Sequence, residues 1–223
     1  MICLVTDRRR LASRLSLGSD SPQVLDLLVV IAADAVDAGV DVVQVRERDL
    51  PTSALTDVVR RLVDVAHGKG SSIVVNDRLD VALAAGAHGL HLKEAPIAID
   101  RIRSIAPAGF IVGQSCHSVD QARDSTADYV IVGTVFPTRS KPTMSLIGLV
   151  GLEAVARITK TPVLGIGGIR LEHLSKVAAT GAAGIAAVDL FLPDSVRRVP
   201  MRDIVSQARR AFVRGRTPLD SRQ

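Results

Sequence analysis

His117 is the side chain in this sequence best suited to moving protons. It lies in the segment GQSCHS at 113–118, directly after an apolar run that is typical of a strand. An imidazole titrates near neutral pH, so it can accept a proton and return it within one reaction. We therefore interpret His117 as a candidate general acid–base residue; the alternative is a structural histidine bonded to a backbone carbonyl. His91, at the end of another such run, is interpreted as structural.

Two consecutive glycines, Gly167 and Gly168, follow a further apolar run. Without side chains, their backbone N–H groups can come close to an anion, and the start of a following helix adds positive potential. The alternative is an ordinary turn. Their place after the seventh of eight strand-like runs favours a phosphate site.

A long loop at 133–148 carries Thr138, Ser140 and Lys141. One cation and two hydroxyl donors suit a second anionic group, and such a loop can close over a bound ligand. Long loops in compact domains are usually either functional or disordered, so the alternative is an exposed loop without a fixed role.

Further polar side chains follow the other strand-like runs. They are Gln44, Arg46, Arg48, Asn76, Asp77 and Ser115. The carboxyl ends of parallel strands meet at one face of a barrel, where the catalytic groups of such folds stand. We therefore expect these side chains to share one site with His117.

The elements that must position these residues are short β-branched runs separated by segments with helical spacing. The runs occupy 2–6, 41–46, 72–75, 89–92, 110–113, 129–132, 163–166 and 184–188. The helical stripes include Val24, Leu27, Leu28, Ile31 and Ala35, and then Leu55, Val58, Val59, Leu62 and Val65. Alternating strands and helices predict βαβ units and a parallel sheet, since a parallel crossover needs such a connection.

Eight such units in 223 residues favour closure into a single (β/α)₈ TIM barrel, an α/β fold. The alternative is an open doubly wound sheet, because one sequence does not reveal the order of the strands. We place the barrel at 1–212 and expect a polar, frayed C-terminal tail at 213–223.

The composition narrows the class of ligand. Hydrophobic residues make up 47% of the chain and aromatic residues only 2%, so the core must be aliphatic. The net charge of +5 is scattered, and few aromatic side chains are available to stack bases, so we expect no nucleic acid partner. No apolar stretch is long enough to cross a membrane. Two widely separated cysteines and a start without a leader pattern indicate a reducing, cytoplasmic setting.

Seven segments, taken in order, resemble the thiamine phosphate synthase/TenI superfamily. They are QVRERDL, VVNDRLDVAL, GLHL, GQSCHS, ADYVIVGTVFPTRSK, TPVLGIGGI and GAAGIAAV, and the resemblance runs from about Ile2 to Phe212. It implies a (β/α)₈ barrel and one of two activities in thiamine biosynthesis. Synthases couple a pyrimidine pyrophosphate with a thiazole phosphate and release pyrophosphate through a pyrimidine cation. TenI-type tautomerases aromatise a thiazole carboxylate phosphate by proton transfer, without metal.

The resemblance also assigns roles to single positions. Gln44 and Arg46 match the pyrophosphate end, Asp77 of the Asn76–Asp77 pair matches a magnesium ligand, Ser115, Thr138 and Lys141 match pyrophosphate-binding positions, and Gly168 matches the thiazole phosphate loop. Ser140 replaces a threonine and keeps its hydroxyl. His117 resembles the catalytic histidine of the tautomerases, although synthases often carry a histidine there too.

Three departures from the synthase pattern concern the site. Pro96 stands where synthases carry a second magnesium carboxylate, and Glu94 or the charge of Lys93 would have to substitute for it. Arg48 replaces a lysine, which keeps the charge but changes the donor geometry. Asp189 replaces a serine near the phosphate, where a carboxylate about 4 Å from a phosphate oxygen would cost about 4 kcal/mol. We therefore expect Asp189 to cap the final helix with its side chain turned away.

These departures favour a TenI-like thiazole tautomerase that uses His117 and no cofactor. One alternative is a thiamine phosphate synthase with an altered metal site, which would use Mg²⁺ at Asp77. The other is a non-catalytic paralogue that binds metabolites of the pathway. The expected partner is a small phosphorylated thiazole, joined by a pyrimidine pyrophosphate if the protein is a synthase, and the sequence leaves open a homo-oligomer.

Overall fold

Eight parallel strands form a closed barrel in the computed structural model, which describes residues 1–93, 98–138, 146–193 and 199–214. The strands are β1 (Ile2–Val5), β2 (Val42–Val45), β3 (Ser72–Asn76), β4 (Gly89–Leu92), β5 (Ile111–Cys116), β6 (Tyr129–Gly133), β7 (Val163–Ile166) and β8 (Gly184–Ala187). Each strand pairs with its neighbours in sequence, and β8 returns to β1. The single (β/α)₈ TIM barrel is therefore confirmed, and the open sheet is excluded.

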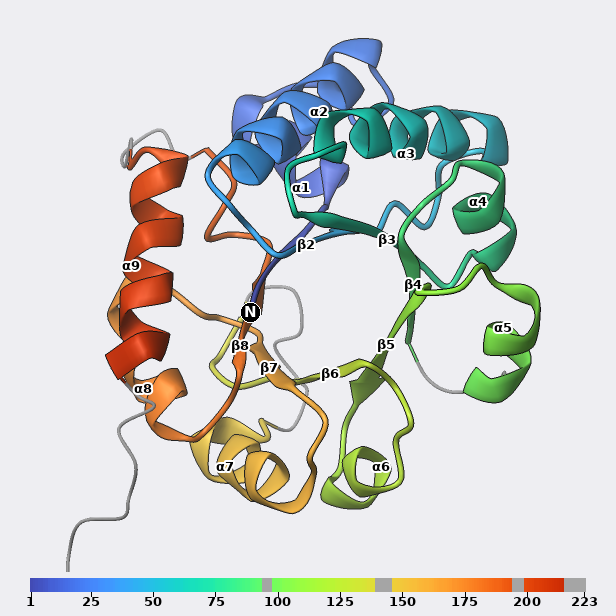
Figure 1. Ribbon diagram of the computed structural model, residues 1–223. Helices are drawn as coiled ribbons and strands as arrows, with labels where there is room; N and C mark the ends of the chain where they lie inside the picture. Colours follow the sequence, from blue (N-terminus) through green and yellow to red (C-terminus); the bar gives the residue numbers. More distant parts are fainter. Residues whose placement is uncertain (94–97, 139–145, 194–198, 215–223) are drawn as a thin grey trace, which may run out of the picture.

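The helices surround the barrel (Figure 1). They are α1 (Arg8–Leu15), α2 (Pro22–Asp37), α3 (Thr52–Ala66), α4 (Leu79–Ala84), α5 (Ile99–Ile105), α6 (Val119–Arg123), α7 (Gly148–Ile158), α8 (Leu174–Ala179) and α9 (Met201–Arg214), with a 3₁₀ turn η1 (Leu171–His173) before α8. The rest of the predicted tail, 215–223, lies outside the described residues. None of the described helices combines the length and apolar character needed to cross a membrane.

Closure of the barrel depends on a close approach between β1 and β8. Ile2 pairs with Ile185 and Cys3 with Ala186, and the backbone N–H of Ile185 donates to the Met1 carbonyl at 3.0 Å. A Cβ on Gly184 would lie 1.7 Å from that carbonyl oxygen. Only glycine therefore fits at the amino end of β8.

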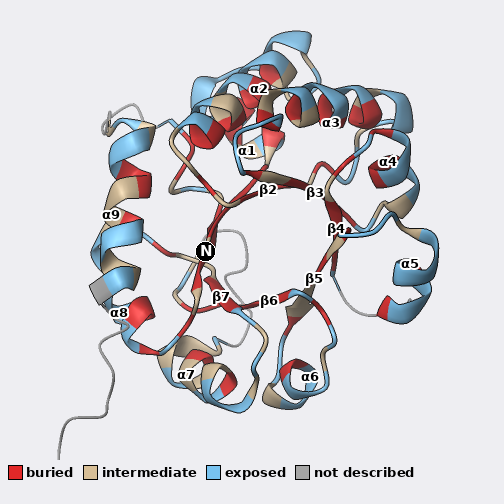
Figure 2. Ribbon diagram, viewed as in Figure 1, coloured by how far each residue is buried: buried red, intermediate tan, exposed pale blue. Residues whose placement is uncertain are grey.

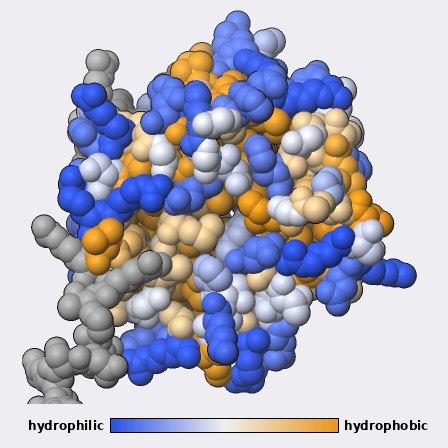
Figure 3. Space-filling model, in the orientation of Figure 1, coloured by the Kyte–Doolittle hydropathy of each residue, from blue (hydrophilic) through white to orange (hydrophobic). Residues whose placement is uncertain are grey.

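The core has two layers of aliphatic side chains. One layer fills the barrel interior and includes Val5, Val74 and Leu164, while the larger layer lies between the strands and the helices. Buried residues occupy the strands and the inner helix faces, and the outer faces are exposed (Figure 2). In the space-filling view, hydrophilic side chains cover much of the rim, with apolar patches among them (Figure 3). The predicted aliphatic core is thus present.

Two details of the predicted elements were wrong. Leu27 belongs to the predicted stripe of α2 but is 36% exposed, because the buried face of that helix is centred on Val24, Leu28 and Ala35. Strand β5 extends to Cys116 rather than ending at 113. Ser115 therefore belongs to the barrel wall and not to a loop, which fixes its side chain more firmly.

A buried cation joins the start of α1 to the segment after β2. Arg8 is 2% exposed, and its guanidinium donates to both carboxylate oxygens of Asp49, at 2.6 and 2.8 Å, and to Asp20 at 2.9 Å. The buried carboxylate of Glu47 accepts the backbone N–H of Arg8, and burial raises the pKa of Glu47 to about 6. The bidentate partner lowers the pKa of Asp49. This cluster holds the backbone that carries Arg46 and Arg48.

Replacing Arg8 with methionine should destabilise the fold, because it leaves Glu47 buried without its cation. We expect Arg8→Met to lower the free energy of unfolding by about 3 kcal/mol in urea titrations. Arg9→Met is the matched control, since Arg9 contacts the same Asp49 at 2.6 Å but is 67% exposed; it should cost less than about 1 kcal/mol. Equal effects of the two substitutions would contradict this account.

Candidate active site

A cavity of about 1910 Å³ opens at the carboxyl ends of the strands. Nine of the predicted site residues line it, namely Gln44, Arg46, Arg48, Asn76, Ser115, His117, Thr138, Gly167 and Gly168. Typical small-molecule pockets measure about 300–1,000 Å³. This cavity is larger because it continues from the barrel mouth to the groove between α1 and the segment after β8. Ser140, Lys141, Glu94 and Pro96 lie outside the described residues.

One end of the cavity presents hydrogen-bond donors from β2. Gln44 is 2% exposed, and its side-chain Nε2 has no hydrogen-bond partner within the described part of the chain. The backbone N–H of Arg46 donates to the Thr6 hydroxyl at 2.9 Å, which fixes the chain where the Arg46 side chain leaves the strand. A buried donor without a partner costs about 1–3 kcal/mol. The Gln44 amide is therefore suited to an acceptor oxygen of a ligand.

Asp77 links the ends of β3 and β4. Its carboxylate accepts from the Asn76 side-chain amide at 2.9 Å and from the Lys93 backbone N–H at 2.8 Å. Its own φ is +57°, a left-handed conformation that aspartate tolerates better than most residues. Asn76 and Lys93 line the cavity. Asp77 does not, so it borders the site from the ends of these strands.

The fit of this corner to Mg²⁺ follows from its oxygen donors. Within the described ranges, no three His, Cys, Asp or Glu side chains cluster as a metal site would require. Magnesium is, however, often held by one or two carboxylates together with substrate phosphates. Each carboxylate oxygen of Asp77 accepts one described hydrogen bond and keeps a further lone pair. A single carboxylate completed by phosphate oxygens therefore fits.

His91 borders the cavity but is almost completely buried, between two hydroxyl groups. Its Nδ1 lies 3.1 Å from the Tyr129 hydroxyl and its Nε2 lies 3.0 Å from the Ser115 hydroxyl. Burial lowers the pKa of His91 to about 3, so the ring is neutral at physiological pH. The sequence predicted that His91 is structural but did not single out Tyr129. The only tyrosine of the chain was the available signal.

His117 is exposed and lines the cavity, as its predicted role requires. Its backbone N–H donates to the Gln121 side chain at 2.7 Å, and the Ser118 hydroxyl caps the first turn of α6 by accepting from the Gln121 N–H. These bonds fix the backbone at His117 while the ring faces the cavity rim. An acid–base role for His117 stays a prediction.

The two glycines after β7 take left-handed φ values of +102° and +62°. A Cβ on Gly168 would lie 2.5 Å from the Pro137 carbonyl oxygen, so packing against the loop after β6 requires this glycine. The helix contribution to anion binding is smaller than the sequence suggested, because the short 3₁₀ turn η1 precedes α8. A phosphate site here would therefore depend mainly on backbone N–H groups and nearby cations.

The nearby cations are two arginines of α1, which Asp189 holds in place by ion pairs. Its carboxylate contacts Arg10 at 2.8 Å and Arg14 at 2.5 Å, and all three residues line the cavity. The prediction that Asp189 caps the final helix was wrong, since α9 begins only at Met201. The trio carries a net charge of +1, so the expected conflict with a phosphate is offset. The sequence did not identify Arg10 and Arg14, although their i,i+4 spacing places them on one helix face.

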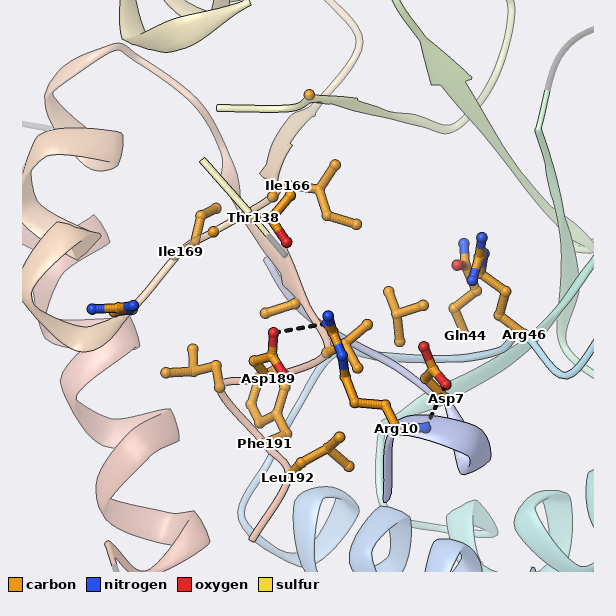
Figure 4. Close-up of a pocket in the computed structure, with 18 of the residues that line it drawn as sticks. Asp7, Arg10, Gln44, Arg46, Thr138, Ile166, Ile169, Asp189, Phe191 and Leu192 are labelled. Atoms are coloured by element: carbon orange, nitrogen blue, oxygen red, sulfur yellow. Dashed lines mark hydrogen bonds and ion pairs between the residues drawn. The ribbon is translucent and has the colours of Figure 1, made fainter. Parts of the chain in front are cut away.

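The two ends of the cavity lie on opposite sides of Arg10 (Figure 4). Gln44 and Arg46 lie on one side, and Asp189 and Phe191 on the other. The apolar side chains of Ile131 and Ile166 line the cavity between strands β6 and β7. The site can therefore hold two anionic groups at separate places with an apolar surface near them.

Known proteins resemble the chain over most of its length. Residues 19–191 match the family described as thiamine monophosphate synthase. The thiamine-phosphate synthase of Roseiflexus castenholzii is 33% identical over 215 residues, which cover 93% of this chain and 89% of that protein. The thiamine-phosphate synthase of Pyrococcus horikoshii is 36% identical, covering 71% of this chain and 77% of its own. The chain belongs to the thiamine monophosphate synthase family.

A solved structure agrees with this assignment. The thiamine phosphate pyrophosphorylase from Pyrococcus furiosus superposes with a TM-score of 0.76 at 28% identity, and the match covers 96% of both chains. The predicted resemblance and the prediction of an enzyme are confirmed. These relatives are named synthases, so they support the transferase alternative and not the tautomerase that we favoured from sequence.

Gly168 offers a direct test of the phosphate end. Gly168→Ala should weaken binding of a thiazole phosphate at least about tenfold in calorimetry, because the new Cβ displaces the loop at Pro137. Gly181→Ala is the control for backbone strain, since Gly181 also has a positive φ of +81° but its added Cβ would meet only Ala156, at 3.8 Å. Unchanged affinity in a folded Gly168→Ala protein would remove this loop from the site.

His91 predicts a specific pH dependence of stability. The lowered folded-state pKa means that acid protonates His91 in the unfolded chain first, so stability falls as pH drops from about 6.5 towards 3. His91→Gln should be less stable at pH 7, but its free energy of unfolding should fall less steeply as pH drops through this window. The two slopes should differ by about 1.4 kcal/mol per pH unit. His67→Gln, at an exposed histidine, should keep the unmodified slope. Parallel curves for His91→Gln and the unmodified protein would refute the neutral buried ring.

Proposed function

We propose that this protein is a thiamine-phosphate synthase. It would join a pyrimidine pyrophosphate to a thiazole phosphate: the carbon–oxygen bond to pyrophosphate breaks, and a bond forms between that carbon and the thiazole nitrogen. The observation that carries the proposal is the large cavity with cationic and hydrogen-bond-donating side chains at each end, in a chain whose named relatives are synthases. A reaction between two anionic substrates requires such an arrangement.

The end formed by β2, β3 and β5 would take the pyrophosphate. The Gln44 side-chain N–H groups, which have no partner among the described residues, the Arg46 guanidinium and the Ser115 hydroxyl provide donors for its oxygens. Hydrogen bonds between charged donors and phosphate oxygens are the stronger kind. Asp77, with the phosphate oxygens, would hold Mg²⁺, which when bound neutralises the charge of the leaving pyrophosphate. These donors stabilise the leaving group as its bond to carbon breaks.

The end formed by β7 and β8 would take the phosphate of the thiazole. Gly167 and Gly168 leave room for close approach of an oxygen, and Arg10 and Arg14 provide positive charge held in place by Asp189. Binding both phosphates fixes the distance and orientation between the reacting carbon and nitrogen. Such orientation can contribute about 7–11 kcal/mol to lowering a barrier.

Apolar side chains at the barrel mouth would receive the two rings. Val5, Ile131, Ile166 and Ala187 line the cavity at the ends of four strands. A pyrimidine cation reacts readily with water, so a surface that excludes water favours capture by the thiazole nitrogen.

Tautomerase activity is the second candidate, because His117 lines the same cavity and is exposed to it. In that case His117 would accept a proton at one position of a thiazole carboxylate phosphate and return it at another. That reaction neither consumes a pyrimidine pyrophosphate nor releases pyrophosphate. The two activities can therefore be separated by their need for the pyrimidine substrate.

The deciding experiment incubates the purified protein with the pyrimidine pyrophosphate and the thiazole phosphate, with and without Mg²⁺, and in a separate reaction with the thiazole carboxylate phosphate alone. We expect thiamine phosphate and pyrophosphate in equal amounts, only with Mg²⁺. Asp77→Asn should lower turnover at least about 100-fold, whereas Asp57→Asn, an exposed carboxylate on α3, should not change it. If no thiamine phosphate forms but the thiazole carboxylate is aromatised, the tautomerase is correct, and His117→Asn should then abolish that turnover.

A further inference from the structure

Three side chains inside the barrel form a continuous hydrogen-bonded chain that ends at the cavity. Tyr129 on β6 contacts His91 on β4 at 3.1 Å, and His91 contacts Ser115 on β5 at 3.0 Å. Tyr129 is 1% exposed and does not line the cavity, whereas His91, which is 2% exposed, and Ser115 both border it. Ser115 is only partly buried, so it is the member of the three that a ligand reaches most easily.

The strand register provides the room for these hydrogen-bonded side chains. His91 is paired with Gly113 and Gly113 with Tyr129, so the three residues lie side by side across β4, β5 and β6. A Cβ on Gly113 would lie 2.2 Å from Cζ of the Tyr129 ring. The ring occupies the space that a side chain at 113 would take, and so its hydroxyl reaches His91 across the intervening strand.

The direction of the hydrogen bonds follows from the protonation states. Burial raises the pKa of the Tyr129 phenol, so it stays an O–H donor that needs an acceptor. In the described part of the protein that acceptor is Nδ1 of His91. A neutral imidazole carries one proton, which must then be on Nε2. The Nε2–H therefore donates to the Ser115 oxygen.

Ser115 is left with its own hydroxyl proton to donate. Its oxygen accepts from His91, and no acceptor for the Ser115 O–H occurs among the described residues. Because the hydroxyl lines the cavity, the proton is available to a ligand oxygen. Hydrogen bonds in a chain polarise one another, so a donor at the end of such a chain is stronger than an isolated serine.

We propose that Tyr129 and His91 are positioning residues that hold Ser115 as a hydrogen-bond donor towards an acceptor oxygen of the bound ligand. On the proposed function, that oxygen belongs to the pyrophosphate. Tyr129 lies away from the cavity and His91 is 2% exposed at its border, so both act through Ser115. The opposite direction, with Ser115 donating to His91, would present only a serine lone pair to the cavity and would disfavour an anion there.

Nitrogen-15 NMR of the histidine rings tests the direction without any ligand. We expect His91 to be neutral with its proton on Nε2 from pH 5 to pH 8, and to change tautomer balance in Tyr129→Phe. A proton on Nδ1 in the unmodified protein, or a charged ring, would overturn the proposal. This measurement does not depend on whether the protein is a synthase.

Calorimetry with inorganic pyrophosphate and Mg²⁺ tests the coupling. We expect Ser115→Ala to weaken binding about tenfold and Tyr129→Phe about three- to tenfold, with the double variant no weaker than Ser115→Ala within about twofold. Ser125→Ala is the control, since its hydroxyl bonds to Gln114 at 2.7 Å and does not line the cavity. Additive losses would show that Tyr129 does not act through Ser115 and would overturn the proposal.

Failure of the proposed function gives a different result. If the unmodified protein binds no pyrophosphate, the synthase proposal is contradicted, and the tautomer of His91 alone decides the positioning proposal. If Tyr129→Phe does not fold, His91→Gln replaces it in the same cycle. A loss in His91→Gln that adds to the loss in Ser115→Ala would again overturn the proposal.

Discussion

The pairing of β1 with β8 is the constraint on which the rest of the molecule depends. It requires Gly184, because any side chain there would collide with the Met1 carbonyl. Once the ring is closed, the carboxyl ends of all eight strands open into one cavity. In an open sheet the ends of β1 and β8 would lie far apart, and Asp189 could not meet the arginines of α1. Closure therefore creates the site as well as the core.

Buried and paired charges then place the functional groups around the ring. Arg8, with Asp49 and Glu47, anchors the segment after β2, and Asp189 does the same for α1 on the opposite side. Each cluster fixes cations at one end of the cavity. Between the ends, His91 and Tyr129 stay uncharged. In the proposed arrangement Tyr129 donates to His91, and His91 donates to Ser115. The site thus concentrates positive charge at its two ends and keeps an apolar surface at its centre.

Much of this arrangement could be predicted from sequence because it depends on local patterns. Strand-like runs, helical stripes and the polar residues after each run predicted the barrel and placed Gln44, Arg46, Ser115 and Gly168 at one face. The pairing of Asp189 with Arg10 and Arg14 could not be predicted, since it joins residues from opposite ends of the chain that only closure brings together. The link from Tyr129 to His91 depends on the register of three strands and a missing side chain at Gly113.

The preference for a tautomerase is not supported by the relatives, for a related reason. It gave most weight to Pro96 and Asp189, single positions that depart from the synthase pattern. The structure shows that the charge of Asp189 is compensated by two arginines, and Pro96 lies outside the described residues. The relatives, whose similarity extends over most of the chain, support the synthase instead. A departure at one position is weak evidence when its charge partners are unknown.

The most direct test of the account is a crystal structure of the protein soaked with inorganic pyrophosphate and Mg²⁺. We expect pyrophosphate at the β2–β5 end, with oxygens within hydrogen-bonding distance of Gln44 Nε2 and Ser115 Oγ and with Mg²⁺ at Asp77. Pyrophosphate bound instead at the Gly168–Arg10 end, with Gln44 and Ser115 left without a ligand oxygen, would contradict the assignment of the two ends of the cavity.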